Sequence, residues 1–147
     1  MRFEFLSPIH KATRQIGSYL EPRCAQAGVS NREGHLLSYL RSYEPVTIGG
    51  VLRVFGERPS TVTSMLDRLA SQGLIRRAPG KEDRRQVVLT LTAKGRASAD
   101  RLRRCLADFE AKIRADMDPR DLQGFQAVLD AIARVTTADV AGKESPR

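Results

Sequence analysis

Apolar positions recur at helical intervals over most of this 147-residue chain. The first such segment runs from Pro8 to about Ala27 and ends at Gly28, a residue type that commonly terminates helices. A second begins after Ser30 and stops before Pro45. Its opening, Ser-Asn-Arg-Glu, is a capping box, because the side chains of Ser30 and Glu33 can each accept a hydrogen bond from the other residue's backbone amide. The two apolar stripes contain Ile9, Ile16, Leu20, Cys24, Leu36, Leu37 and Leu40.

Two shorter helices are predicted next. Thr47 can cap a helix that continues through Phe55, although Gly49 and Gly50 each cost about 1 kcal/mol relative to Ala in a helix interior. The helix from Pro59 to Gln72 has a clearer pattern, since proline is favoured in a first turn and apolar residues recur at i, i+3, i+4 and i+7. These apolar residues are Val62, Met65, Leu66 and Leu69, and the opposite, hydroxylic and basic face carries Ser60, Thr61, Thr63, Ser64 and Arg68.

The pattern then changes to that of strands. The segments Leu74 to Arg77 and Gln86 to Leu91 suit two β-strands, and turn-forming Pro79 and Gly80 lie between them. We therefore expect a two-stranded hairpin with a long tip.

Two long helices complete the predicted order. Thr92 can cap a helix that runs to about Asp116, and Asp118-Pro119 is the cap and first residue of a last helix. The tail from Ala141 to Arg147 has no apolar period, so we expect it to be loose.

Composition agrees with a mainly helical chain. Only 5% of the residues are aromatic and tryptophan is absent, so aliphatic residues must form most of the core. The length allows one compact unit with added dimerisation helices. The predicted fold is mainly α with a small β-hairpin.

Positive charge is concentrated around the hairpin. Residues 74–104 contain ten Lys or Arg and three acids, an excess of +7 in a chain whose net charge is +8. A surface that meets phosphates needs such an excess, although a basic stretch on a helical protein is more often an ordinary solvated face.

The order of elements adds a specific interpretation. Two short helices, the second with a polar face, followed at once by a hairpin make a winged helix-turn-helix. The helix from Pro59 to Gln72 fits a major groove, where its Ser and Thr side chains can contact base edges or phosphates, and Arg68 can meet a phosphate. The same hydroxylic residues also suit plain exposed surface near a helix start.

At the hairpin tip, Asp83 can tether one of two arginines and leave the other extended. We assign insertion into a narrow minor groove to Arg85 and phosphate contact to Arg84, with Asp83 as the brace, while the two arginines can exchange roles.

The segment DRLASQGLIRR followed by KEDRRQVVLTLTAKG resembles the MarR family of winged helix-turn-helix transcription regulators. Asp83-Arg84-Arg85 matches that family's wing motif, Leu91-Thr92 with Gly95 matches its LTxxG ending, and the residues from Pro59 to Thr63 match the start of its recognition helix. The motifs cover about Pro59 to Gly95, and the flanking helices fit in order and length.

The resemblance implies a single domain over 1–147, with a DNA-binding part at about 30–95 and dimerisation helices at about 1–29 and 96–140. It further implies a homodimeric regulator, typically a repressor, that binds a pseudo-palindromic operator in double-stranded DNA and is released by a small aromatic or anionic effector or by an oxidant. Two positions depart from the pattern. Arg58 replaces a small capping residue and adds a charge that can reach a phosphate, and Gly49-Gly50 weakens the supporting helix.

Some residues allow a signal-sensing hypothesis beside a structural one. Cys24 and Cys105 can be oxidation sensors, but a cysteine on an apolar stripe is more often a small buried hydrophobe. His10, His35, Tyr39 and Arg14 can line an effector pocket, and packing or surface roles are favoured for each. The effector-binding residues stay unknown.

Other classes of function lack sequence support. The chain has two histidines, no Gly-rich phosphate loop, no nucleophile elbow and no metal-ligand spacing, so we expect no catalytic residues, no metal and no cofactor. It lacks an apolar run that could cross a bilayer, and we expect a cytoplasmic protein. A winged-helix module that binds an acidic protein or RNA without operator specificity is the alternative hypothesis.

Overall fold

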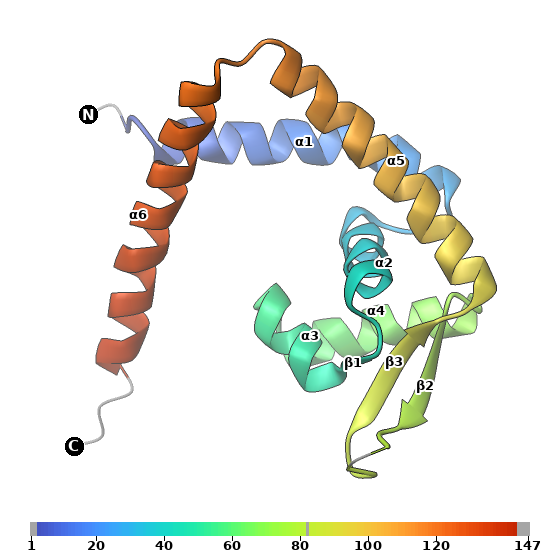
Figure 1. Ribbon diagram of the computed structural model, residues 1–147. Coiled ribbons are helices and arrows are strands. Elements are labelled where there is room, and N and C mark those ends of the chain that lie inside the picture. The colour runs from blue at the N-terminus through green and yellow to red at the C-terminus, as the bar shows by residue number, and fades with distance from the viewer. Residues whose placement is uncertain (1–2, 82, 144–147) are drawn as a thin grey trace. The chain divides into compact units, whose positions relative to one another are not determined.

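The computed structural model describes residues 3–81 and 83–143, with side chains through residue 136. The chain forms two compact units, residues 1–106 and 107–147. Helices dominate both units, and the first unit also contains a small β-sheet (Figure 1). The prediction of a mainly helical fold with a small β component is therefore confirmed.

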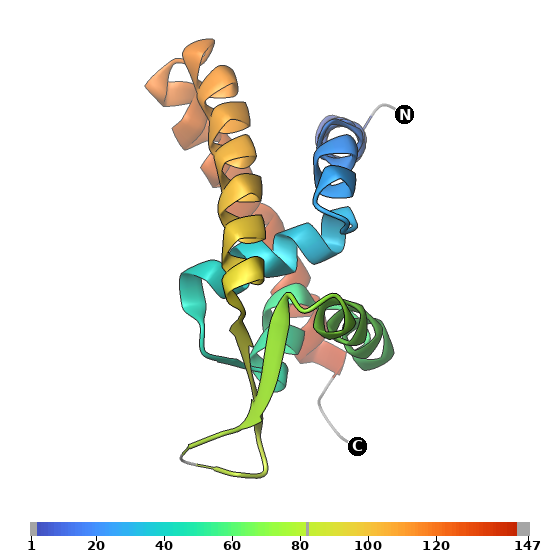
Figure 2. The same cartoon turned by 90° about the vertical axis from the view of Figure 1, so that its right-hand side faces the viewer.

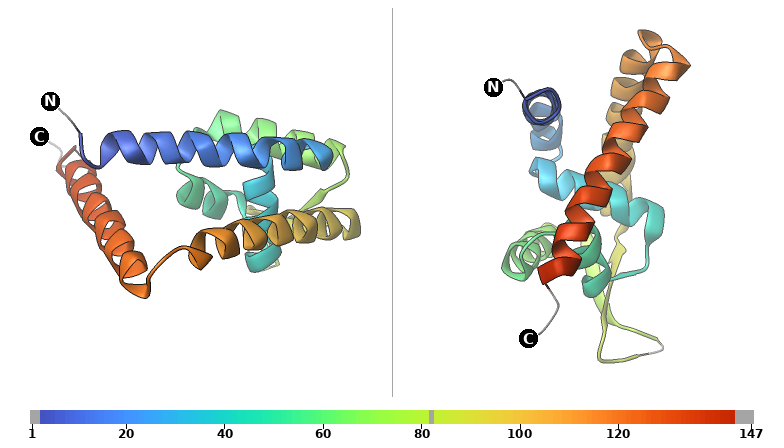
Figure 3. Two further views of the ribbon diagram at one scale, coloured as in Figure 1. Left: turned by 90° about the horizontal axis from the view of Figure 1, so that it is seen from above. Right: turned by 90° about the vertical axis from the view of Figure 1, so that its left-hand side faces the viewer.

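The first two helices follow the apolar pattern. Helix α1 (Leu6–Gln26) begins slightly before the predicted start at Pro8, and helix α2 (Asn31–Tyr43) ends before Pro45 as expected. The capping box of α2 is formed, since the Glu33 amide donates to Ser30 Oγ at 3.3 Å and the Ser30 amide donates to Glu33 Oε2 at 2.8 Å. In the views of Figure 3, α2 crosses between α1 and the first part of α5.

The helix-turn-helix consists of α3 (Ile48–Phe55) and α4 (Pro59–Ser71). The predicted cap of α3 is confirmed, because Thr47 Oγ1 accepts a hydrogen bond of 3.0 Å from the Gly50 amide. Helix α4 begins with Pro59 in its first turn, and Arg58 at its N-cap makes no side-chain capping bond.

The sheet has one strand more than the predicted hairpin. Strands β2 (Ile75–Pro79) and β3 (Val87–Leu91) pair antiparallel, and β1 (Val46–Thr47) pairs with the other edge of β3, giving the order β1-β3-β2. The prediction that Pro79 lies in the turn was wrong, since Pro79 is the last residue of β2 and pairs with Val87. An edge strand tolerates proline because one of its sides needs no hydrogen-bond donor.

The core of the first unit lies where α2, α4 and the sheet meet. The predicted apolar faces of α2 and α4 supply most of it, together with strand residues, and its fully buried side chains include Leu36, Leu37, Leu40, Val62, Leu66, Leu69 and Leu89. Burial of each such side chain contributes about 1.5–3 kcal/mol, so this core is a main source of stability for the unit. Ile16 of α1 remains 41% exposed and lies outside this core.

The junction of β3 and α5 (Ala93–Ala115) is closely packed against the start of β2. The Thr92 amide donates to the Leu74 carbonyl at 3.0 Å, and Thr92 Oγ1 donates to the Gly73 carbonyl at 2.6 Å and accepts from the Gly95 amide at 3.0 Å. A Cβ on Gly95 would lie 1.9 Å from the Leu74 carbonyl oxygen. The contact explains why a glycine follows Leu-Thr at this spacing.

The second unit contains the end of α5 and helix α6 (Pro119–Lys143). The predicted cap is confirmed, because Asp118 Oδ1 accepts from the Arg120 amide at 2.8 Å and the Asp118 amide donates to Asp121 Oδ2 at 2.9 Å. Helix α6 continues through Lys143, so the prediction of a loose tail from Ala141 was wrong for its first three residues, and the rest of that tail lies outside the described residues. Among the described helices, none combines the length and apolarity needed to cross a membrane.

Replacing Gly95 by alanine is expected to destabilise the protein by about 3 kcal/mol, because the added methyl group must displace the Leu74 backbone. Gly17→Ala in α1 is the matched control, since its Cβ would meet only Asn31 Nδ2 at 3.8 Å, and it should stabilise by roughly 0.5–1 kcal/mol. Urea unfolding measures both changes, and equal stabilities of the two variants would contradict the packing described here.

Candidate nucleic-acid interface

Helix α4 presents the predicted hydroxylic face to solvent. Ser60, Thr63 and Ser64 are exposed and Thr61 is half-buried, whereas the apolar residues of the helix face the core. Thr63 Oγ1 donates to the Pro59 carbonyl at 2.9 Å, which holds that side chain against its own helix. Exposed Arg58 stands at the start of the same helix. The residues that the sequence singled out on α4 are thus brought together near its N-terminus.

Arg68 on α4 also takes part in the packing of the helices. Its Nε lies 2.6 Å from Oε1 of Glu33, whose side chain is only 5% exposed, while the Arg68 side chain is 56% exposed. The other oxygen of Glu33 caps α2 through the Ser30 amide. The Glu33 carboxylate therefore caps α2 and also anchors α4 through Arg68. The Arg68 side chain nevertheless stays partly exposed to solvent.

Glu33 is held as a carboxylate by these partners. Burial by itself raises its pKa, but the hydrogen bonds from the Ser30 amide, Arg68 and the Ser30 hydroxyl, together with the charge of Arg68, outweigh burial and lower the pKa below its ordinary value. The folded protein therefore favours the ionised form of the Glu33 side chain.

The tip of the hairpin, here called the wing tip (residues 80–86), is organised by Asp83. Its Oδ1 accepts from the Arg85 amide at 2.9 Å, its Oδ2 accepts from Gln86 Nε2 at 3.3 Å, and its carbonyl accepts from the Gln86 amide at 3.1 Å. The sequence interpretation had Asp83 tether an arginine side chain, whereas the structure places the carboxylate on the backbone of Arg85. The side chains of Arg84 and Arg85 are exposed.

Several cations near the wing are used within the fold. Arg77 pairs with Asp67 of α4 at 2.6 Å, Arg96 pairs with Glu44 at 2.9 Å, and Lys94 Nζ donates to the Gln72 carbonyl at 2.8 Å. Four cations of the hairpin form no ion pair with a described residue. They are Arg76, Lys81, Arg84 and Arg85. Sequence counting alone does not separate these two groups of cations.

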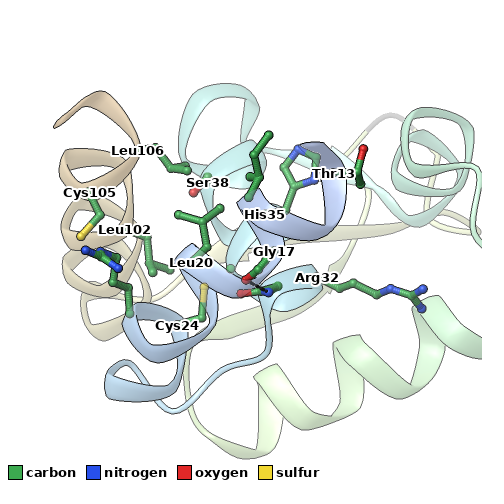
Figure 4. Close-up of a pocket in the computed structure, with 14 residues that line it drawn as sticks. Thr13, Gly17, Leu20, Cys24, Arg32, His35, Ser38, Leu102, Cys105 and Leu106 are labelled. Carbon is green, nitrogen blue, oxygen red and sulfur yellow. Dashed lines mark hydrogen bonds between the residues drawn. The ribbon is translucent and has the colours of Figure 1, made fainter. Parts of the chain in front are cut away.

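A cavity of about 440 Å³ lies between α1, α2 and α5 in the first unit (Figure 4). Its walls are mainly apolar and include Leu20, Leu102 and Leu106, with His35 and both cysteines also lining it. Of the residues weighed for an effector pocket, His35 lines this cavity, whereas His10, Arg14 and Tyr39 do not. Tyr39 instead packs against Tyr43 and Phe55, with ring centroids 4.9 and 5.6 Å away.

Two residues that line the cavity each carry a buried polar atom without a hydrogen-bond partner. Asn31 Oδ1 and Ser38 Oγ are buried and have no hydrogen-bond partner among the described residues. Arg32 extends away from the cavity in Figure 4 and lies 3.4 Å from Glu57. Burial, together with the nearby Cys105, raises the pKa of the Cys24 thiol, which therefore has the environment of an unreactive buried cysteine.

Comparison with known proteins shows which proteins the chain is similar to. Residues 29–87 match the model of the MarR family. An uncharacterised HTH-type transcriptional regulator of Bacillus subtilis (strain 168), YwhA, is 30% identical over 92 residues, and this match covers 63% of the present chain and 63% of the relative's length.

Solved structures share the MarR-type fold. The S. aureus MepR–DNA complex superposes with a TM-score of 0.83 at 18% identity, over 91% of this chain and 99% of that one. A mutant of E. coli MarR complexed with operator DNA superposes with a TM-score of 0.74 at 20% identity, over 86% of this chain and 91% of that one.

Within the part of the chain that the structure describes, no cluster of three or more His, Cys, Asp or Glu side chains could hold a metal ion.

The lowered pKa of Glu33 predicts a specific acid sensitivity. Its carboxylate stabilises the fold fully above the pKa of an unfolded glutamate, about 4.3, and this contribution disappears as the pH falls through the lower folded value. Glu33→Gln should lower the free energy of unfolding at pH 7 by about 1–3 kcal/mol and flatten its decline in the acid range.

Urea unfolding between pH 3 and pH 7 measures both effects. Glu21→Gln, which removes one carboxylate from an exposed position of α1, is the control and should leave the profile unchanged. Coincident curves for wild type and Glu33→Gln would show that the Glu33–Arg68 pair does not stabilise the fold, and parallel but offset curves would contradict the lowered pKa of Glu33.

Proposed function

We propose that this chain is a transcriptional regulator of the MarR family and that it binds double-stranded DNA in a sequence-specific manner. The observation that carries the proposal is the position of the hairpin relative to α4. The hairpin leaves the end of α4, extends beyond the helices of the first unit (Figure 2), and is tied to α4 by the ion pair of Arg77 and Asp67. An exposed hydroxylic helix and an arginine-bearing wing tip are thus joined in one body.

In this proposal α4 enters the major groove. Ser60, Thr61, Thr63 and Ser64 contact base edges or phosphates near the start of the helix, and the exposed charges of Arg58 and Arg68 contact the backbone. The wing tip, braced by Asp83, carries Arg84 and Arg85 to the adjacent backbone and minor groove. The DNA complexes of MepR and of the E. coli MarR mutant, which share this fold, support the choice of DNA as the partner.

We further propose a homodimer bound to a pseudo-palindromic site. The described part of α6 exposes large apolar side chains on successive turns, among them Leu122, Phe125 and Leu129, which are 46%, 53% and 37% exposed. A stripe of this kind on a charged protein is a suitable surface for a second copy. Two copies would place their α4 helices in successive major grooves, about 10 base pairs apart.

The cavity between α1, α2 and α5 supports a ligand-responsive repressor. Its volume of about 440 Å³ falls within the range of small-molecule sites, and its walls are mostly apolar with a few polar groups. A small aromatic or anionic effector that binds there with different affinity in the DNA-bound and free states would release the repressor from its operator.

The wild-type protein should enrich a pseudo-palindromic sequence from a pool of random duplexes. Arg84→Ala should then weaken binding to the selected duplex by about tenfold, since it removes a charged contact from the wing tip. Arg104→Ala, which removes one exposed charge from α5, is the control. Fluorescence anisotropy measures the affinities.

Equal affinity for selected and random duplexes would contradict operator recognition. It would favour the alternative of a winged-helix module for RNA or an acidic protein.

Phe125→Asp should convert the dimer to a monomer, because it places a charge in the apolar stripe of α6. Gln123→Asp introduces the same charge on another side of the helix and should leave the dimer intact. Sedimentation velocity gives the mass of each. A wild-type protein that sediments as a monomer at micromolar concentration would contradict the proposed assembly.

A further inference from the structure

The C-terminal half of α4 is held against the beginning of α2 and the turn before it by two hydrogen bonds. Arg68 Nε donates to Glu33 Oε1 at 2.6 Å, and Gln72 Nε2 donates to the Gly28 carbonyl at 3.0 Å. Arg68 and Gln72 are four residues apart, so they lie on one side of the helix. These two contacts are here called the α4 clamp. Sequence analysis named Arg68 as a phosphate contact and predicted neither of these hydrogen bonds.

The segment that receives the α4 clamp is itself held in place by hydrogen bonds. Glu33 Oε2 accepts from the Ser30 amide at 2.8 Å, and Asn31 Nδ2 donates to the Gly17 carbonyl of α1 at 2.8 Å. Gly28 has a φ of +73°, a conformation that residues with a side chain rarely adopt, so the path of this turn depends on glycine. The clamp therefore fixes α4 relative to both α1 and α2.

The N-terminal half of α4, which carries the hydroxylic face, has no comparable polar contact. Thr63 Oγ1 donates to the Pro59 carbonyl of its own helix, and no side chain of residues 59–64 forms a hydrogen bond to another described element. Buried Val62 and Met65 hold this half by apolar packing, which is not directional. The direction of the whole helix is therefore set largely at its C-terminal half.

A small change at the clamp becomes larger at the N-terminal end of the helix. The helix rises by about 12 Å between Arg68 and Ser60. A tilt of about 5° at Arg68 would thus move Ser60 by about 1 Å, which is enough to break a hydrogen bond to a base edge. Long arginine side chains can follow a phosphate through such a shift. Loss of the clamp should therefore affect base recognition more than backbone binding.

We propose that Glu33 and Gln72 are positioning residues for sequence recognition. They fix the direction of α4, and with it the placement of the hydroxylic face on the base edges, without contacting the bases themselves. Arg68 carries the effect of Glu33 to α4, because it is the residue through which the carboxylate holds that helix. The inference rests on the proposed DNA binding and adds to it residues that determine selectivity from outside the interface.

The first test compares binding to the duplex selected by the wild-type protein with binding to a mixed-sequence duplex of equal length. Glu33→Gln retains the capping box, which accepts either residue type, but it takes away the anionic partner of Arg68. It should reduce the ratio of the two affinities by about tenfold. Affinity for the mixed duplex should stay within about twofold of wild type and its salt dependence should not become flatter, because no cation is lost.

A second variant tests the other contact of the clamp. Gln72→Ala changes an exposed side chain, so the core is untouched, and it should reduce the affinity ratio by about threefold through the loss of one hydrogen bond. Ser71→Ala is the matched control. It removes the hydrogen bond from Ser71 Oγ to the Arg68 carbonyl, which stays within α4, and should keep the wild-type ratio.

Fluorescence anisotropy gives the affinities at a temperature where circular dichroism shows every variant to be fully folded. Partial unfolding lowers the active fraction of the protein and weakens binding to both duplexes alike. An unchanged ratio for Glu33→Gln would therefore limit Glu33 to a structural role and overturn the inference. A ratio for Gln72→Ala equal to that of Ser71→Ala would overturn the role of Gln72. If the wild-type protein binds neither duplex, or both equally, the proposed function itself fails.

Discussion

The position of the wing depends on one backbone group, the carbonyl of Leu74. This oxygen accepts from the Thr92 amide at 3.0 Å and from Thr92 Oγ1 at 3.3 Å, and it lies so close to Gly95 that no side chain fits there. Since Leu74 lies three residues after the end of α4 and Thr92 directly precedes α5, the contact joins the end of one helix to the start of the next. The wing between them is therefore oriented by hydrogen bonds to backbone atoms, which keep their strength when surface charges are screened by salt.

Local signals explain how far the fold could be predicted from the sequence. The capping box at Ser30, the Thr47 cap and the Asp118-Pro119 start all depend on residues within three or four positions, and each is formed as predicted. Strand β1 was missed because its two residues are too few to show an alternating pattern, and only pairing with β3 makes them a strand. Its prediction would have required knowledge of the tertiary contact.

The residue types of the candidate site could be predicted from the sequence, but the contacts between those residues could not. The hydroxylic face of α4 followed from helical periodicity, but the partner of Arg68 is Glu33, 35 positions earlier, and no local pattern joins them. The same holds for the hydrogen bond from Gln72 to the Gly28 carbonyl, which joins residues 44 positions apart. Charge counting has a related limit, because Arg77 and Arg96 carry the same charge as Arg85 in the sequence yet are paired with Asp67 and Glu44 in the fold.

The first turn of α2 connects the two regions to which we assign function. Asn31 and Gly34 line the cavity between α1, α2 and α5, and Glu33 in the same turn holds Arg68 of α4. A ligand that contacted Asn31 from this cavity would act on the turn that carries this carboxylate. Because Glu33 is buried and makes its hydrogen bonds to both helices, it cannot follow a shift of one helix without weakening its bond to the other. A rigid ionic contact of this kind couples the start of α2 to α4 more directly than the apolar core, whose side chains can repack.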